Sequence, residues 1–144
     1  METEAMGRVT VEATIENYGD AWNVSRGLIP ADQARRIEVA DALVDTGATL
    51  FSLPSRFIEQ LGLQQVGTKR GRGTTGVGEA RLFSAVRLTI QGRSCTTDVL
   101  EVPDDIPILI GQLPLENLDF VVDLRAQKLV GNPAHGGEHI FEMY

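Results

Sequence analysis

Residues 42–50 read Ala-Leu-Val-Asp-Thr-Gly-Ala-Thr-Leu. Three apolar residues precede an acid, a hydroxyl residue and a glycine, and mostly apolar residues follow. A carboxylate at the tip of a buried strand must be hydrogen-bonded or functional, because burying an unpaired charge is costly. The Asp-Thr-Gly tripeptide, Asp45 to Gly47, occurs once in the chain. Two interpretations are open: Asp45 performs chemistry, or it only caps backbone N–H groups of its own turn.

Length, composition and charge describe one acidic globular domain. The chain has 144 residues, of which 42% are hydrophobic and 23% charged, and this suffices for a single domain with a sizeable core. The formal net charge of −7 argues against a general nucleic-acid binder, because such a protein needs basic surface to replace counterions.

The sequence carries few signals of compartment. Cys95 is the only cysteine, so no intrachain disulfide can form. Residues 1–7 have neither a basic region nor an apolar core, and no apolar run approaches the ~20 residues that cross a bilayer. We therefore expect no signal peptide, no membrane as a partner and a cytoplasmic location.

The hydrophobic pattern predicts many short strands and two short helices. Residues 8–16 alternate apolar and polar side chains, which is the period of a half-buried strand. Pro54 suits the first turn of a helix and Gly62 its exit. The expected strands are 8–16, 36–44, 48–53, 79–90, 94–102 and 120–123, the expected helices are 54–61 and 113–118, and 20–34 reads as an irregular connection. This succession favours a mostly β, closed or sandwich-like domain.

A glycine-rich segment interrupts the strand-like runs. Residues 69–78 read Lys-Arg-Gly-Arg-Gly-Thr-Thr-Gly-Val-Gly, which predicts a mobile hairpin. Residues 71–76 also spell G-x-G-x-x-G, but a dinucleotide site needs a helix after the glycines, and here a strand pattern follows. Lys69, Arg70 and Arg72 could contact a phosphate or an acidic peptide, although solvated loop charges are the favoured interpretation.

The chemistry of an Asp-Thr-Gly loop depends on whether a second carboxylate is present. A single carboxylate with an ordinary pKa is a poor catalyst at neutral pH, because it is neither a strong base nor a protonated acid. Two facing carboxylates cannot both ionise, so the pair holds one proton and titrates as a unit. One member can then deprotonate a water while the other protonates a carbonyl or a leaving amine.

Three segments together resemble retropepsin-like (retroviral-type) aspartic proteases, and especially their bacterial single-domain relatives. They are residues 42–49, the Ile-Leu-Ile-Gly run at 108–111, and the helix-like residues 113–118. The resemblance implies a mostly β, closed acid-protease barrel with one or two short helices and a glycine-rich flap hairpin. It places that domain at residues 1–131 and leaves 132–144 as a C-terminal tail.

The resemblance also implies roles for individual residues. Asp45 would be the catalytic acid and base, and Thr46, Gly47 and Ala48 would complete the active-site loop. The flap that closes over substrate would comprise Thr74, Thr75, Gly76, Val77 and Gly78, and the site-supporting segment would comprise Leu109, Ile110 and Gly111. Because one chain supplies one Asp45, the resemblance implies a homodimer that hydrolyses a peptide or protein without metal or cofactor. The alternative is a non-catalytic peptide-binding or dimerisation module of the same fold.

Two other sets of residues could carry chemistry. His135 to His139 spell H-x-x-E-H, a pattern that binds zinc when it lies on a helix, but two central glycines disfavour a helix here. A surface tail is the favoured interpretation of this stretch. Cys95 alternates with its neighbours as a buried small hydrophobic residue would, and both histidines lie in the tail, so a Ser-His or Cys-His centre is hard to build.

Overall fold

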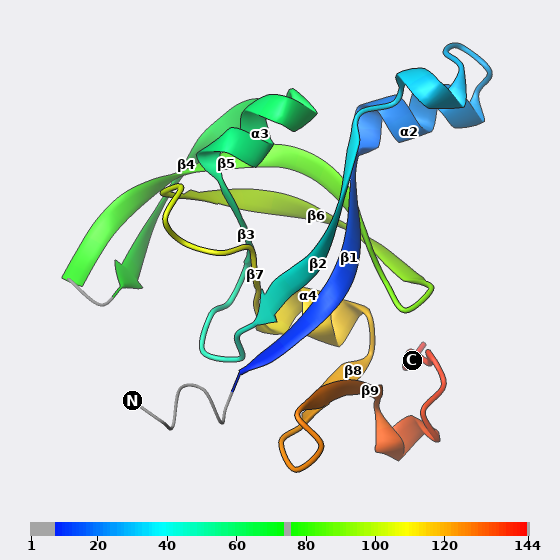
Figure 1. Cartoon of the computed structure of the whole chain (residues 1–144), viewed down its shortest axis with the longest axis vertical. Helices are drawn as coiled ribbons and strands as arrows, with labels where there is room; N and C mark the ends of the chain where they lie inside the picture. The colour runs from blue at the N-terminus through cyan, green and yellow to red at the C-terminus, as the bar shows by residue number, and fades with distance from the viewer. Residues whose placement is uncertain (1–7, 74–75, 144) are drawn as a thin grey trace.

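The computed structural model describes residues 8–73 and 76–143, and in these residues the fold is mostly β, as the sequence predicts (Figure 1). The strands are β1 (Val9–Asn17), β2 (Arg36–Val44), β3 (Phe51–Pro54), β4 (Gln64–Gly73), β5 (Gly76–Ile90), β6 (Arg93–Val102), β7 (Leu109–Ile110), β8 (Phe120–Asp123) and β9 (Lys128–Gly131). The helices are α2 (Tyr18–Ser25), α3 (Ser55–Leu61) and α4 (Gln112–Asn117), with 3₁₀ turns η1 (Ala31–Gln33) and η2 (Pro133–His135).

Seven strands form one sheet that closes on itself. Their order is β1-β2-β7-β3-β6-β5-β4, and β1 also pairs with β5, so six strands make a ring and β4 extends β5 beyond it. Side chains from the ring strands and the short helices fill the core, with Phe51, Leu53, Leu88, Ile110 and Leu115 all but inaccessible to solvent. The finer expectation, an acid-protease barrel with a flap, stays a prediction.

A bulge in β2 decides which of its side chains face the core. Val11 pairs with Ala42 but Ala13 pairs with Val39, so β2 carries one extra residue at this point. Because strand side chains alternate, one extra residue moves the following side chains to the opposite face. Ala42 and Val44 therefore face the core, and half-buried Leu43 faces away from it.

Helix α2 corrects two expectations from the sequence. Residues 20–34 were expected to be irregular, and one or two short helices were expected, whereas the described residues contain three α-helices. The side chain of Asn17 accepts a hydrogen bond from the Asp20 N–H and so caps α2. Arg35 donates to both Asp20 carboxylate oxygens, and this pairing holds the pKa of Asp20 below its ordinary value.

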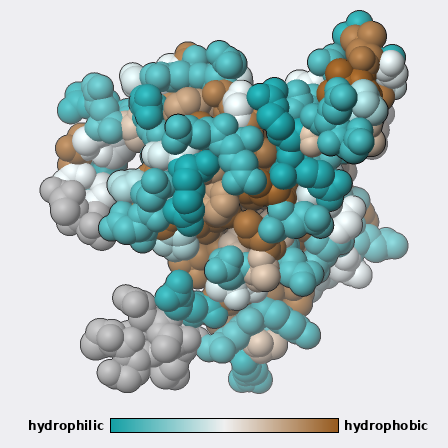
Figure 2. All heavy atoms as spheres, turned by 45° about the horizontal axis from the view of Figure 1, so that its top comes forward, coloured by the Kyte–Doolittle hydropathy of each residue, from teal (hydrophilic) through white to brown (hydrophobic). Residues whose placement is uncertain are grey.

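The projecting α2 segment packs weakly on the ring. No residue of α2 is buried, and Trp22 and Leu28 are more than half exposed. Figure 2 shows apolar atoms gathered at the upper right, where this segment projects from the molecule. In residues 8–73 and 76–143, no helix is both long and apolar enough to cross a membrane.

The C-terminal residues fold back onto the domain around Asp119. Its carboxylate lies 2.7 Å from His135 Nδ1 and accepts a hydrogen bond from the Ile140 N–H. The Arg93 guanidinium donates to the carbonyls of Asp119 and Gly137 and thus joins β6 to the tail. The tail is therefore held by side chains that lie far from it in the sequence.

Candidate active site

The Asp45 loop begins where β2 ends and is fixed by backbone hydrogen bonds. The Asp45 N–H donates to the Ile110 carbonyl at 2.9 Å, and the Ala48 N–H donates to the Asp45 carbonyl at 3.0 Å. The Gly47 N–H donates to Asp45 Oδ1 at 3.0 Å, which is the turn-capping contact expected of an aspartate here. Oδ2 accepts no hydrogen bond from the part of the chain that the structure describes, so capping leaves one oxygen available for chemistry.

Strand β7 supports the loop by lying between the strands that flank it. It pairs in parallel with β2, where Val44 faces Ile110, and in antiparallel with β3, where Phe51 faces Ile110. The strand expected at residues 48–53 therefore starts only at Phe51, because 48–50 belong to the loop. The structure thus brings the loop residues Asp45 to Ala48 together with the segment Leu109 to Gly111.

Gly111 lies directly against the loop backbone. Its N–H donates to the Leu50 carbonyl, and the next two N–H groups, those of Gln112 and Leu113, donate to the carbonyls of Ala48 and Thr49. A Cβ at position 111 would lie 2.5 Å from the Leu50 carbonyl oxygen and 2.8 Å from that of Ala48. Only glycine allows this contact without moving the loop.

The face of the sheet that carries Asp45 also carries apolar side chains. Leu43, two residues before Asp45, pairs with Leu109 of β7, and both are half-buried. Cross-strand partners lie on the same face of a sheet, so the two leucines are apolar neighbours on the face that points away from the core. Sequence reasoning missed Leu43, because its outward direction depends on the bulge at the preceding residues.

Three of the five candidate flap residues, Gly76, Val77 and Gly78, begin strand β5 of the β4–β5 hairpin. Thr74 and Thr75 lie outside the described residues. Gly76, Val77 and Gly78 are exposed and pair with Gly73, Arg72 and Gly71. Figure 1 shows this hairpin projecting from the ring at the left. Strands on both sides of residues 74–75 agree with a hairpin and not with the helix that a dinucleotide site requires.

Thr46 presents its side chain to solvent. The residue is exposed, and its hydroxyl makes no hydrogen bond within residues 8–73 and 76–143. A hydroxyl at this place is free to bond to a second molecule that approaches the loop. Asp45 itself is half-buried, so its carboxylate lies at the surface of the sheet and not in the core.

Other candidate groups lie away from the Asp45 loop. Burial raises the pKa of the Cys95 thiol to about 11, which disfavours the nucleophilic thiolate. His135 contacts Asp119, and His139 Nε2 lies 3.1 Å from the Asn117 carbonyl. Among the described residues, no group of three or more His, Cys, Asp or Glu side chains could hold a metal ion.

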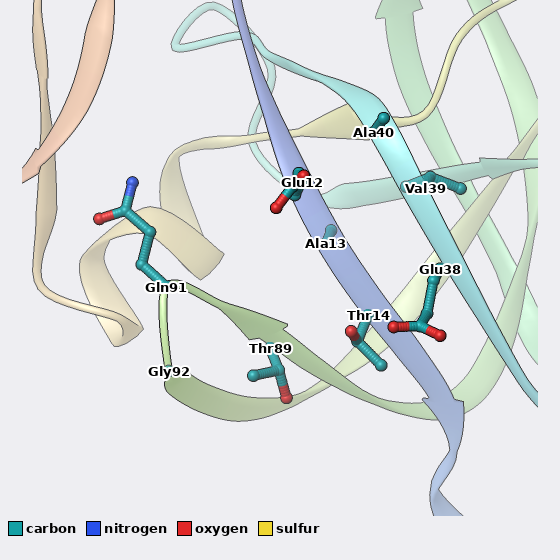
Figure 3. A pocket seen from close by; sticks show the side chains of 9 residues that line it. All are labelled: Glu12, Ala13, Thr14, Glu38, Val39, Ala40, Thr89, Gln91 and Gly92. Carbon is teal, nitrogen blue, oxygen red and sulfur yellow. The ribbon is translucent and has the colours of Figure 1, made fainter.

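A surface hollow of about 500 Å³ lies beside the β2 bulge (Figure 3). Residues of β1, β2 and the β5–β6 turn line it, among them Glu12, Glu38 and Gln91. None of the Asp45 loop residues lines this hollow, so its carboxylates do not assist Asp45.

A comparison with protein-family models identifies a match for the chain. A family model described as aspartyl protease matches residues 35–113, which is more than half of the chain. The matched span contains the Asp45 loop, the β4–β5 hairpin and β7. No curated protein matches the chain.

Proposed function

Because the chain belongs to the aspartyl protease family, we propose that it is an aspartic endopeptidase that hydrolyses peptide bonds with a water held by two Asp45 carboxylates, one from each subunit of a homodimer. The observation that carries the proposal is the Asp45 loop itself. Its backbone is fixed from both sides by β7 and Gly111, and its carboxylate keeps one oxygen without a partner among the described residues. A fixed carboxylate at the surface suits a site that two chains complete.

The reaction that we propose needs both members of the pair. One Asp45 is ionised and accepts a proton from the water as the water oxygen attacks the scissile carbonyl carbon. The other Asp45 is protonated and donates to the carbonyl oxygen, so the tetrahedral intermediate carries no uncompensated charge. The Asp45 that took the proton of the water then donates it to the leaving nitrogen. As the C–N bond breaks, the other Asp45 accepts a hydroxyl proton of the intermediate, so the carbonyl of the acid product re-forms and the pair again holds one proton.

The residues around Asp45 would hold an extended peptide. We propose that the hairpin residues Gly76, Val77 and Gly78, with Thr74 and Thr75 between the strands, act as the flap, and that Thr46, Gly47 and Ala48 complete the loop. Leu43 and Leu109 would receive apolar side chains next to the scissile bond. In this proposal residues 1–131 form the protease domain, 132–144 are a C-terminal tail, and the protein acts in the cytoplasm.

The substitution Asp45→Asn tests the catalytic role. It removes the group that holds and accepts the proton while it keeps size and shape, so peptide cleavage should fall at least about 100-fold. Cleavage of a denatured-protein mixture, followed by mass spectrometry of the new termini, measures this. Asp41→Asn is the matched control, because Asp41 is an exposed aspartate of β2, four residues before Asp45, and this variant should cleave like the parent. Full cleavage by Asp45→Asn, with circular dichroism unchanged, would refute the proposal.

A second candidate function is a peptide-binding or dimerisation module with an unused site. One observation favours this second function. The Gly47 N–H donates to Asp45 Oδ1, and this contact gives the aspartate a structural role that involves no chemistry. This candidate predicts that peptides bind but are not cut, and that Asp45→Asn leaves binding unchanged. Titration of labelled peptides into both proteins, with cleavage followed in the same samples, separates the two functions.

A further inference from the structure

The β4–β5 hairpin concentrates positive charge in an acidic chain. Residues 67–80 contain three cations, Lys69, Arg70 and Arg72, and one anion, Glu79, which gives +2 in a chain whose net charge is −7. All three cations are exposed. In the part of the chain that the structure describes they form no ion pair, whereas Arg35, Arg81 and Arg87 each pair with a carboxylate.

Strand geometry divides the three cations between two faces. Side chains two residues apart lie on the same face of a strand, so Arg70 and Arg72 share one face and Lys69 lies on the other. Across the hairpin Arg72 pairs with Val77 and Arg70 with Glu79, and the Arg70 and Glu79 side chains form no salt bridge. Arg70, Arg72 and Val77 line an open hollow of about 400 Å³ together with Gly71.

Strand β4 also has a free edge. It is the last strand in the sheet order and pairs with β5 alone among the described strands. Its residues from Thr68 to Gly73 keep regular register, and all are exposed. The outer N–H and C=O groups of such an edge can pair with another extended chain. Cations on the edge repel a second copy of the same edge and favour an acidic strand.

From this placement we propose that the free edge of β4 binds an extended acidic segment of a partner protein by strand addition. Arg70 and Arg72 lie two residues apart, so the segment that fits carries carboxylates two residues apart, in the pattern acid-x-acid. Each carboxylate then faces one guanidinium while main-chain hydrogen bonds hold the strand. This site lies on the outer edge of the hairpin and does not depend on peptide hydrolysis.

Two labelled peptides of identical composition test the spacing. One carries glutamates at i and i+2 in a Thr/Val-rich strand, and the other carries them at i and i+4, which lie on the same face but are too far apart to meet both arginines. Fluorescence anisotropy with the parent protein should show the i, i+2 peptide binding about two- to fivefold more tightly, because the control peptide meets only one arginine and lacks one exposed charge pair. N-methylation of alternate residues of that peptide should abolish binding, because it blocks strand addition. Equal binding of the two isomers, or undiminished binding of the N-methylated peptide, would overturn the proposal.

Protein variants locate the site. The double substitution Arg70→Gln/Arg72→Gln should remove the preference for the i, i+2 peptide, and Lys69→Gln, on the opposite face, should keep it within about twofold. If Lys69→Gln weakens binding as much as the double variant, or if single-stranded DNA competes as well as the i, i+2 peptide, the hairpin is a general anion surface and the proposal fails. Should the double variant not fold, the peptide comparisons with the parent protein still decide the matter.

Discussion

Gly111 shows how one residue controls the candidate site. It lies against the carbonyls of Leu50 and Ala48, and its own N–H bonds to the first of them. The loop that presents Asp45 is thus packed against backbone that tolerates no side chain. Any group larger than hydrogen at this position must displace the loop, and the carboxylate moves with it.

The substitution Gly111→Ala should therefore lower both stability and cleavage. Overpacking against backbone atoms costs about 1–3 kcal/mol of unfolding free energy, and a displaced Asp45 reduces kcat. Urea unfolding and peptide cleavage measure the two effects. Gly67→Ala is the control, because a Cβ at Gly67 meets no atom within 4 Å. If Gly111→Ala retains parental stability and kcat, the packing account of this loop is wrong.

At the scale of elements, the strands with regular alternation could be predicted from the sequence. Strand β1 occupies Val9–Asn17, close to the predicted 8–16, because its apolar residues recur at the period of a strand. Helix α2 could not be predicted in this way. It buries no face and has Gly19 in its first turn, so it lacks a helical hydrophobic period and depends on the Asn17 cap and the Asp20–Arg35 contact.

The candidate site was predictable only in part, because some of its elements also lack a periodic hydrophobic pattern. Asp45, Gly47 and Gly111 stand out as residue types in an apolar context. The parallel pairing of β7 with β2 involves two residues of each strand, which is too short to give a periodic signal. The resemblance to a protease family, and not periodicity, led to the expectation that the Leu109–Gly111 segment supports the loop.

The tail contact at Asp119 makes a prediction about pH. The hydrogen bond from His135 lowers the pKa of Asp119 from its ordinary value of 3.8, and bonds from Ile140 and Asn132 act in the same direction. A lowered pKa in the folded state means that ionised Asp119 stabilises the protein fully above about pH 3.8 and that this contribution is lost as the pH falls further.

Asp119→Asn should therefore be less stable than the parent at pH 5 and pH 7, with a smaller difference at pH 3. Asparagine also tolerates the positive φ of 58° at this position, so the substitution mainly removes the charge. Urea unfolding at the three pH values measures the difference. Asp105→Asn, at an exposed turn, is the control. A difference that grows between pH 5 and pH 3 would contradict the assigned sign.

At the scale of the whole molecule, one chain supplies one Asp45 loop, and the proposed chemistry needs two. The loop lies at the surface of the ring with Thr46 exposed, where a second chain can reach it. The loop is held in place by the ring of strands, by β7 and by the packing of Gly111. In the proposed function the other half comes from another copy of the chain, and this predicts that activity depends on pairs of intact chains.

Mixing parent chains with Asp45→Asn chains tests this claim most directly. The two proteins are unfolded together, refolded at equal amounts, and assayed for peptide cleavage. If each active unit needs two Asp45 carboxylates, random pairing halves the number of intact pairs, so activity per parent chain falls to about half, and further with excess variant. Refolding with Asp41→Asn instead should leave activity per total chain unchanged. Activity per parent chain that stays constant at every proportion of Asp45→Asn would contradict the shared site.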